Sequence, residues 1–247
     1  MIRFEHVTHR FGRNTAVDDL NLTIPSGELF ALLGRNGAGK TTTIKILVGL
    51  LRPSEGKVWV GDNSVADDPS ETNRLIGYVP DQPQLYDKLT GREFLEFVGQ
   101  MYGLSGAALE EAIERQVAQF QLAEFADQLA ESYSHGMKQR TVFAAALLHE
   151  PRTIVVDEPL VGLDPHSIRL AKDLLRKCAQ GGAAVLMSTH TLAVAEEIAD
   201  RIGIIDRGRL LFAGTLPSLR KELDDSASRL EDLYLRLIDR AESGTGR

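Results

Sequence analysis

The stretch "ELFALLGRNGAGKTTTIKILVGLL", residues 28–51, decides the fold. Its first seven residues (28–34) form an apolar run short enough for a buried strand, and a Pro-Ser-Gly turn (25–27) precedes it. A glycine-rich loop follows, and we predict a helix over residues 40–51. The order of strand, loop and helix places the loop at the carboxyl end of a strand, where α/β proteins bind their ligands.

The loop, residues 34–41, has the pattern G-x-x-x-x-G-K-[ST], which is typical of phosphate-binding loops. Glycines allow a tight turn whose N–H groups point inward at phosphate oxygens, and the following helix adds its positive amino end. Lys40 can reach the β- and γ-phosphates of a nucleotide, and the Thr41 hydroxyl can bind Mg²⁺. The alternative is an ordinary glycine-rich turn, but a chance match in a chain of this length is on the order of 1%. The predicted nucleotide-binding residues here are Gly34, Asn36, Gly37, Ala38, Gly39, Lys40, Thr41 and Thr42.

Further strands are predicted on both sides of this stretch. Leu20, Leu22 and Ile24 alternate with polar residues, and short apolar runs occur at 57–62, 75–80, 153–159 and 183–190. Helical patterns separate the later runs. Strands that alternate with helices predict a mainly parallel sheet with its site at the carboxyl ends of the strands.

The middle of the chain predicts helices. Thr90 and Glu93 fit a capping box at a helix start. Apolar residues at helical spacing follow it: Phe94, Leu95, Phe97, Val98 and Met101, and then Leu109, Ile113, Val117 and Phe120. We expect a helical insertion at about 83–150 within a domain of residues 1–225, and an amphipathic helix in a tail of residues 226–247.

Two acidic residues end the run at 153–159. Adjacent residues at the end of a strand point to opposite faces, so Asp157 and Glu158 are expected to have different roles. Asp157 is placed to hold Mg²⁺ through water, and Glu158 to orient or activate an attacking water as a general base. The alternative is a pair of solvated acids at the start of a loop.

His190 ends the run at 183–190. A histidine at a strand end can simply satisfy local backbone groups. Beside a phosphate-binding loop, however, a third strand of the sheet would deliver this imidazole to the γ-phosphate. We therefore predict His190 as a second catalytic residue.

Together with "SHGMKQR" (134–140) and "GLDP" (162–165), these motifs resemble, in identity and order, those of the ATP-binding subunit of ABC transporters. The resemblance covers roughly residues 2–220. It implies an α/β fold: a P-loop NTPase core with a mainly parallel sheet, an N-terminal antiparallel β subdomain and an inserted α-helical subdomain. It also implies that ATP and Mg²⁺ bind and that the chain is an ATPase coupled to transport.

In that family the segment around residue 134 is a signature motif that acts across a dimer. The resemblance implies that Ser134, with backbone N–H groups near Gly136, caps the γ-phosphate held by the other subunit. A hydroxyl and free N–H groups at a helix start form an anion site, and the same geometry also serves an ordinary N-cap. The segment that contains Asp164 resembles the loop that passes between the two sites in that family. Phe11 takes the place of the aromatic residue that stacks on adenine, although composition alone favours a core position for it.

The sequence departs from the family pattern at two motifs. The signature usually reads Leu-Ser-Gly-Gly-Gln, whereas residues 133–137 are Tyr-Ser-His-Gly-Met. The glutamine that normally binds the metal is replaced by Asp81, with Gln82 next, so either side chain could face Mg²⁺. The segments at 137–140 and 85–97 resemble exporters of the drug, polysaccharide and antibiotic-resistance type.

Composition narrows the class of protein. The net charge is −7, so broad attraction to nucleic acid is not expected, and the single cysteine excludes an internal disulfide framework. Without an apolar stretch long enough for a membrane span, we expect a cytoplasmic protein that docks on transmembrane permease subunits.

A second ATP-binding subunit, identical or paralogous, is the other expected partner. Alternatives are an importer subunit, a soluble ATP-driven clamp on ribosomes or DNA, and a non-catalytic member of a heterodimer.

Overall fold

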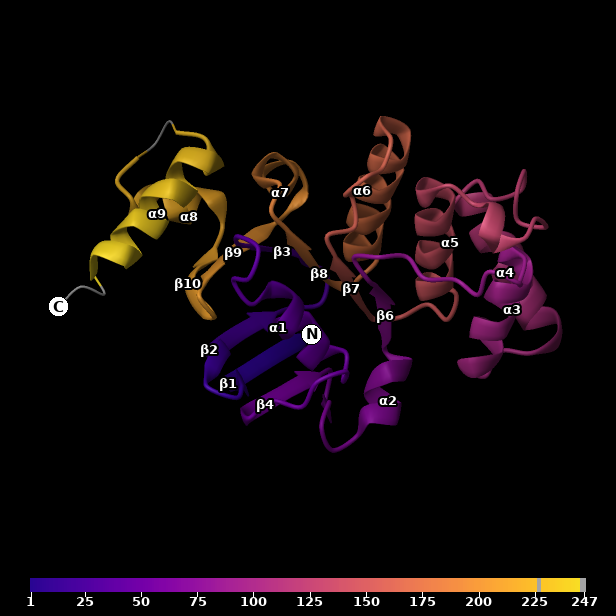
Figure 1. The fold of residues 1–247 in the computed structure, drawn as a ribbon, viewed down its shortest axis with the longest axis horizontal. Helices are drawn as coiled ribbons and strands as arrows, with labels where there is room; N and C mark the ends of the chain where they lie inside the picture. The colour runs from indigo at the N-terminus through magenta and orange to yellow at the C-terminus, as the bar shows by residue number, and fades with distance from the viewer. Residues whose placement is uncertain (226–227, 245–247) are drawn as a thin grey trace.

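The computed structural model describes residues 1–225 and 228–244, and its elements form two sheets flanked by helices (Figure 1). A smaller antiparallel sheet holds β1 (Ile2–Phe11), β2 (Asn14–Ile24), β4 (Glu55–Val60) and β5 (Asn63–Ser64) in the order β2-β1-β4-β5. Inward and outward residues alternate along β2, as its sequence predicts. This sheet is the predicted N-terminal antiparallel subdomain.

The larger sheet has the order β10-β9-β3-β8-β7-β6. Its strands are β3 (Leu29–Leu33), β6 (Ile76–Val79), β7 (Thr153–Asp157), β8 (Ala184–Thr189), β9 (Arg201–Asp206) and β10 (Arg209–Gly214). All pairings are parallel except β9 with β10. The carboxyl ends of β3, β7 and β8, which precede the predicted site residues, therefore meet at one edge.

Each face of the larger sheet belongs to a different hydrophobic core. Phe30 and Leu32 of β3 pack with the smaller sheet and with α1 (Lys40–Leu47), whereas Leu29 and Ala31 pack on the opposite side. The opposite side is covered by α6 (Pro165–Gln180) and α7 (Leu192–Ile198). Both faces being buried explains why the strand sequences are continuously apolar.

The region around α1 differs from the prediction in two ways. Helix α1 ends at Leu47 rather than at residue 51, because Gly49 adopts a positive φ of 74°, which ends a helix readily. A short helix, α2 (Pro69–Arg74), lies between β5 and β6 and was not predicted.

The helical insertion contains α3 (Gly91–Met101), α4 (Gly106–Gln119), the short 3₁₀ turn η1 (Ala130–Ser132) and α5 (His135–Leu147). The predicted capping box is present, with Thr90 and Glu93 exchanging two hydrogen bonds of 2.8 and 3.1 Å. Phe94 and Leu95 are buried, whereas Phe97 and Met101 are exposed, so only part of the predicted apolar face of α3 packs against the core.

The carboxyl-terminal part of the chain holds α8 (Leu216–Glu222) and α9 (Leu230–Gly244), at the opposite end of the molecule from the helical insertion (Figure 1). The predicted amphipathic face is buried against α7 and α8 through Leu230, Leu233, Tyr234, Leu237 and Ile238. Residues 226–227 and 245–247 of the predicted tail lie outside the described residues.

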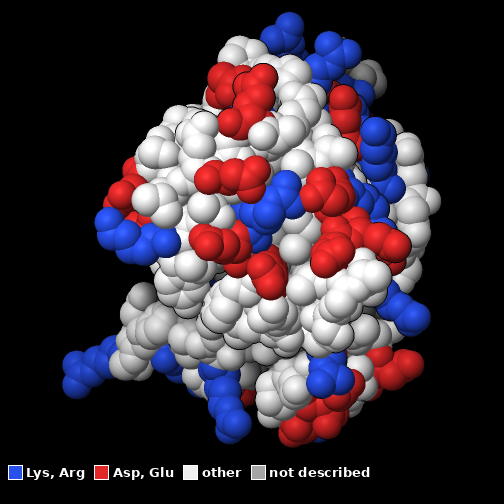
Figure 2. Space-filling view, turned by 90° about the vertical axis from the view of Figure 1, so that its right-hand side faces the viewer, with Lys and Arg blue, Asp and Glu red and all other residues white. Residues whose placement is uncertain are grey.

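Figure 2 shows the molecule from the side of the helical insertion, where acidic and basic side chains are interspersed. Arg92 pairs there with both Glu114 and Asp127. Interspersed charge of this kind does not provide the continuous basic surface that binds a phosphate backbone. Within the described residues, no helix is both long and apolar enough to span a membrane.

Candidate active site

The phosphate-binding loop opens into a cavity of about 620 Å³. Gly39 has a φ of 111°, and a Cβ atom there would lie 2.5 Å from the Ala16 carbonyl oxygen, so only glycine fits. The loop therefore approaches β2 closely and turns its backbone toward the cavity. The residues that line the cavity are Asn14, Thr15, Ala16, Arg35, Asn36, Gly37, Gly39, Lys40, Thr41, Thr42, Asp81, Glu158 and Arg207.

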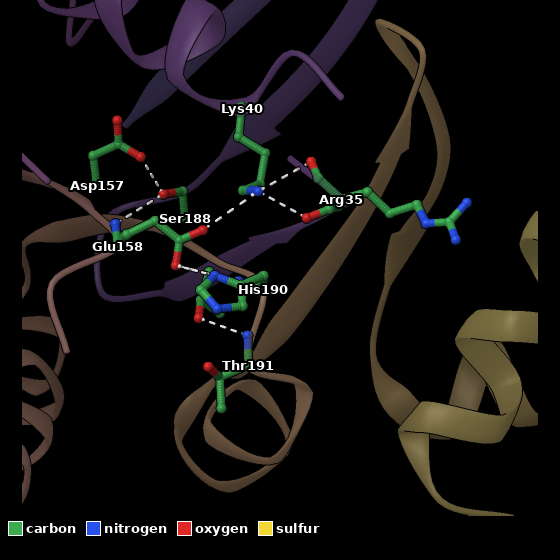
Figure 3. Close-up of polar contacts among 9 residues, drawn as sticks. Arg35, Lys40, Asp157, Glu158, Ser188, His190 and Thr191 are labelled. Carbon is green, nitrogen blue, oxygen red and sulfur yellow. Dashed lines mark hydrogen bonds and ion pairs between the residues drawn. The ribbon is translucent and has the colours of Figure 1, made fainter. Parts of the chain in front are cut away.

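Lys40 lies at the base of the loop, and its side chain is only 6% exposed. Its ammonium group donates to the carbonyl oxygens of Gly34, at 2.7 Å, and Arg35, at 3.3 Å. Glu158 Oε1 lies 3.3 Å from the same nitrogen (Figure 3). The predicted phosphate-binding lysine and the predicted general base thus form an ion pair.

Glu158 also contacts His190, so β7 and β8 bring these two predicted residues together (Figure 3). Its Oε2 atom lies 2.9 Å from His190 Nδ1 and accepts a longer bond from the His190 backbone N–H. Glu158 has a φ of 47°, a conformation that non-glycine residues rarely adopt and that is frequent at functional sites. The carboxylate is therefore held between a lysine and a histidine at the edge of the cavity.

Asp157 points away from Glu158, as predicted for adjacent residues at a strand end, and is completely buried (Figure 3). Its Oδ1 atom accepts a 2.5 Å hydrogen bond from the Ser188 hydroxyl, which in turn accepts the Glu158 N–H at 3.0 Å. Burial raises the pKa of Asp157, while the Ser188 and Thr41 hydroxyls lower it. Its Oδ2 atom is buried without a hydrogen-bond partner, an arrangement that costs free energy unless a ligand or water binds there.

Asp81, rather than Gln82, lines the cavity. The Asp81 carboxylate accepts the Gln82 backbone N–H at 2.9 Å, and its charge raises the pKa of Asp157. Of the two candidates for the metal-binding position, Asp81 is the one near the other acidic groups.

Ser134, Gly136 and Asp164 form a second cluster, and none of them lines the cavity. Ser134 is the N-cap of α5, and its hydroxyl accepts the Met137 N–H at 3.3 Å. A Cβ atom on Gly136 would lie 3.6 Å from Asp164 Oδ2, so the start of α5 adjoins the start of α6. The predicted phosphate cap is exposed and separate from the phosphate loop of its own chain.

Phe11 lies at the end of β1 with half of its surface exposed. The core position that is usual for a phenylalanine is therefore ruled out. The ring packs edge-on against His9, at 4.5 Å between ring centroids. Its exposed position leaves a face of the ring available to a flat ligand.

Two contacts at the site were not predicted from the sequence. Ser188 lies opposite Asp157 in the parallel register of β7 and β8, and the one available signal was a serine that follows four apolar residues in the same strand. Tyr234 of α9 lies near Arg35, the neighbour of Gly34 in the phosphate loop. Burial and the charge of Asp206 raise the pKa of this phenol, and Arg35 lowers it. The C-terminal helix thus reaches the phosphate loop.

Comparisons with known proteins agree with this geometry. A family model described as "ABC transporter" matches residues 17–161. The ABC-type transporter ATP-binding protein EcsA of Bacillus subtilis (strain 168) is 34% identical over 237 residues, which cover 96% of either protein. The linearmycin resistance ATP-binding protein LnrL of the same organism is 35% identical over 223 residues, covering 90% of this chain and 72% of LnrL.

A solved structure is also similar. It is the dimeric post-hydrolysis state of the ATP-binding cassette MJ0796 bound to ADP and Pi, with a TM-score of 0.80 and 29% identity. The similarity covers 87% of this chain and 99% of that one. It confirms the predicted fold class, including both sheets and the helical insertion. The chain therefore belongs to the ABC transporter family, as an ATP-binding subunit that hydrolyses ATP to drive transport.

Proposed function

We propose that two copies of this chain pair head to tail and enclose ATP between the phosphate loop of one copy and the start of α5 of the other. The observation that carries this proposal is the separation of Ser134 from the cavity around Lys40 within one chain. An exposed helix start with a hydroxyl and free N–H groups is an anion site that lacks an anion in its own subunit. The similar cassette MJ0796 is dimeric, which supports the same arrangement here.

Within each site we assign a separate role to each residue. The loop amides and the Lys40 ammonium bind the phosphates, and the exposed face of Phe11 stacks on the adenine. Glu158 takes the proton of the attacking water, and His190 holds that carboxylate in place through the 2.9 Å contact of its Nδ1 atom. In the imidazolium form, which has two N–H groups, the other ring nitrogen of His190 donates to the γ-phosphate. The buried Ser188 fixes both acidic residues by bonding to each.

The residues fit Mg²⁺. The unpartnered Oδ2 atom of Asp157 and the neighbouring Thr41 hydroxyl are hard oxygen ligands, and Asp81 adds a third. No group of three or more His, Cys, Asp or Glu side chains among the described residues forms a metal site by itself. This agrees with an ion that binds mainly to phosphate and water. When bound, Mg²⁺ neutralises phosphate charge.

Complementation between two inactive variants tests the shared site. Lys40→Ala removes the phosphate ligand and Ser134→Arg blocks the cap, so neither variant alone hydrolyses ATP at the normal rate. In an equal mixture, half of the pairs contain one complete site, and activity recovers to at most about a quarter of that of the wild type. Each single variant mixed with the double variant is the control, because no pair in that mixture has a complete site. A mixture as inactive as its components would contradict the proposal.

We propose further that export, through separate membrane subunits, is the process that ATP drives. The names of relatives such as LnrL refer to resistance to a toxic compound, which is the role of an exporter. An importer subunit would use the same ATP site, so the identity of the membrane subunit distinguishes the two.

An exposed apolar surface between the helical insertion and the core is the proposed docking site for those subunits. It comprises Leu50, Tyr86, Phe97 and Met101, and Met101 is 72% exposed. A groove of about 410 Å³ beside it is lined by Leu50, Tyr78, Met101 and others. Apolar side chains gathered at a groove mark a surface that another protein covers.

Met101→Glu tests the docking surface. A carboxylate in an apolar interface costs several kcal/mol, so the variant is expected to lose sedimentation with membranes from its host. ATP hydrolysis by the purified protein should be unchanged, because the residue lies outside the ATP site. Glu96→Gln, on the same helix, is the matched control. Retention of the Met101→Glu variant on membranes would refute the proposed surface.

A further inference from the structure

His135 occupies a position that glycine holds in the usual family signature, and it makes a contact that glycine cannot. It is the first residue of α5, directly after Ser134. Its Nε2 atom lies 3.2 Å from the carbonyl oxygen of Val161, in the loop between β7 and α6. The imidazole thus links the signature segment to a loop 26 residues further along the chain.

The chemistry of the contact fixes the direction of the hydrogen bond. A carbonyl oxygen only accepts, so Nε2 carries the proton and donates it to Val161. The ring also lies against Gly162, where an added Cβ atom would be 3.3 Å from His135 Cδ2. Gly162 has a φ of 75°, so the loop passes under the ring in a conformation that favours glycine.

The loop that His135 contacts carries the general base at one end. The Val161 N–H donates to the Glu158 carbonyl oxygen at 3.3 Å, which closes a turn from Glu158 to Val161. At the other end Asp164 caps α6 by accepting the N–H groups of His166 and Ser167. The loop is anchored at both ends, and His135 is a side-chain contact to its middle.

We propose that His135 is a positioning residue that couples the two ATP sites of the pair. This inference rests on the proposed function, in which Ser134 contacts the ATP of the partner while Glu158 acts on the ATP of its own chain. His135 directly follows Ser134 and bonds to the turn that begins at Glu158. When Ser134 binds the γ-phosphate held by the partner, His135 therefore helps to place Glu158, the general base of its own chain.

A series of substitutions at this position tests the coupling. His135→Leu keeps bulk but cannot donate, and it should lower kcat about tenfold and bring the Hill coefficient for ATP close to one. The KM for ATP, set mainly by the phosphate loop of the same chain, should change less than about twofold. His135→Gln, whose amide can donate to the same carbonyl, should restore at least half of the lost activity.

His166→Leu is the matched control, because His166 is also exposed and its Nε2 atom makes a 3.2 Å contact, but to Gln121 rather than to the loop. It should behave as the wild type. The inference is overturned if His135→Leu keeps its kcat and Hill coefficient, if the Gln variant is no better than Leu, or if the Leu variant also loses thermal stability. Complementation of Lys40→Ala by Ser134→Arg, measured in parallel, shows separately whether the shared site itself exists.

Discussion

The ion pair between Lys40 and Glu158 predicts that Glu158→Gln binds ATP more tightly than the wild type. The carboxylate lies against the ammonium group that the phosphates need, and the two side chains are only 16% and 6% exposed. ATP must therefore compete with Glu158 for Lys40. Removal of the negative charge weakens the competitor without changing the size of the side chain.

The size of the effect follows from the distance. At 3.3 Å and an effective dielectric constant of about 20, the two charges attract by ~5 kcal/mol. Desolvation cancels much of this, and a hydrogen bond to a charged group contributes about 1.5–3 kcal/mol net. A neutral amide keeps roughly half of that, so the substitution releases about 0.8–1.5 kcal/mol, which corresponds to about four- to twelvefold tighter ATP binding.

Turnover should fall in the same variant by a factor of at least about 100, because an amide cannot accept the proton of the attacking water. ATP-bound pairs should then accumulate. Equilibrium dialysis with labelled ATP and Mg²⁺ measures affinity, gel filtration measures pairing, and phosphate release measures turnover. Glu28→Gln is the control. Glu28 forms a 3.0 Å ion pair with Arg201 away from the cavity, and its side chain is about as buried as that of Glu158. Unchanged ATP affinity in Glu158→Gln, or turnover within tenfold of wild type, would refute the reasoning.

Three further predictions concern other parts of the molecule. Ser134→Arg should lower ATP hydrolysis more than about 100-fold while ATP affinity changes less than about twofold, and equal loss of both would indicate a purely structural N-cap. Phe11→Ala should weaken ATP binding by about three- to tenfold in equilibrium dialysis, and an unchanged affinity would exclude base stacking. Burial lowers the pKa of His149 to about 4 in the folded chain, so unfolding by urea should become easier as pH falls from about 6.5 toward 4. His149→Phe, which can still stack on Tyr102, should flatten this pH dependence, and an unchanged slope would count against it.

The sequence predicted the parts of the site that local geometry determines. The phosphate loop depends on glycines within a few residues of Lys40, and the capping box at Thr90 depends on a side chain three residues away. The meeting of Asp157, Glu158 and His190 follows from the rule that parallel strands end at one edge. The order of the motifs along the sequence was therefore enough to predict the fold and the main residues of the site.

Contacts between distant segments could not be predicted in this way. The bond from Ser188 to Asp157 depends on the register of two strands, and the exposure of Met101 depends on which side of α3 meets its neighbours. The contact of His135 with Val161 joins segments that helical periodicity treats as independent. Only the tertiary arrangement specifies these pairs.

The contact between α9 and the phosphate loop makes this chain suited to a fluorescent reporter of nucleotide binding. Leu235 follows Tyr234 and is 52% exposed, so a dye on Leu235→Cys would lie in solvent one residue from a side chain that lies near Arg35. Burial raises the pKa of Cys178, the single native thiol in the sequence, to about 11, and such a thiol reacts slowly with maleimides at neutral pH. Selective labelling is therefore feasible without removing a native residue.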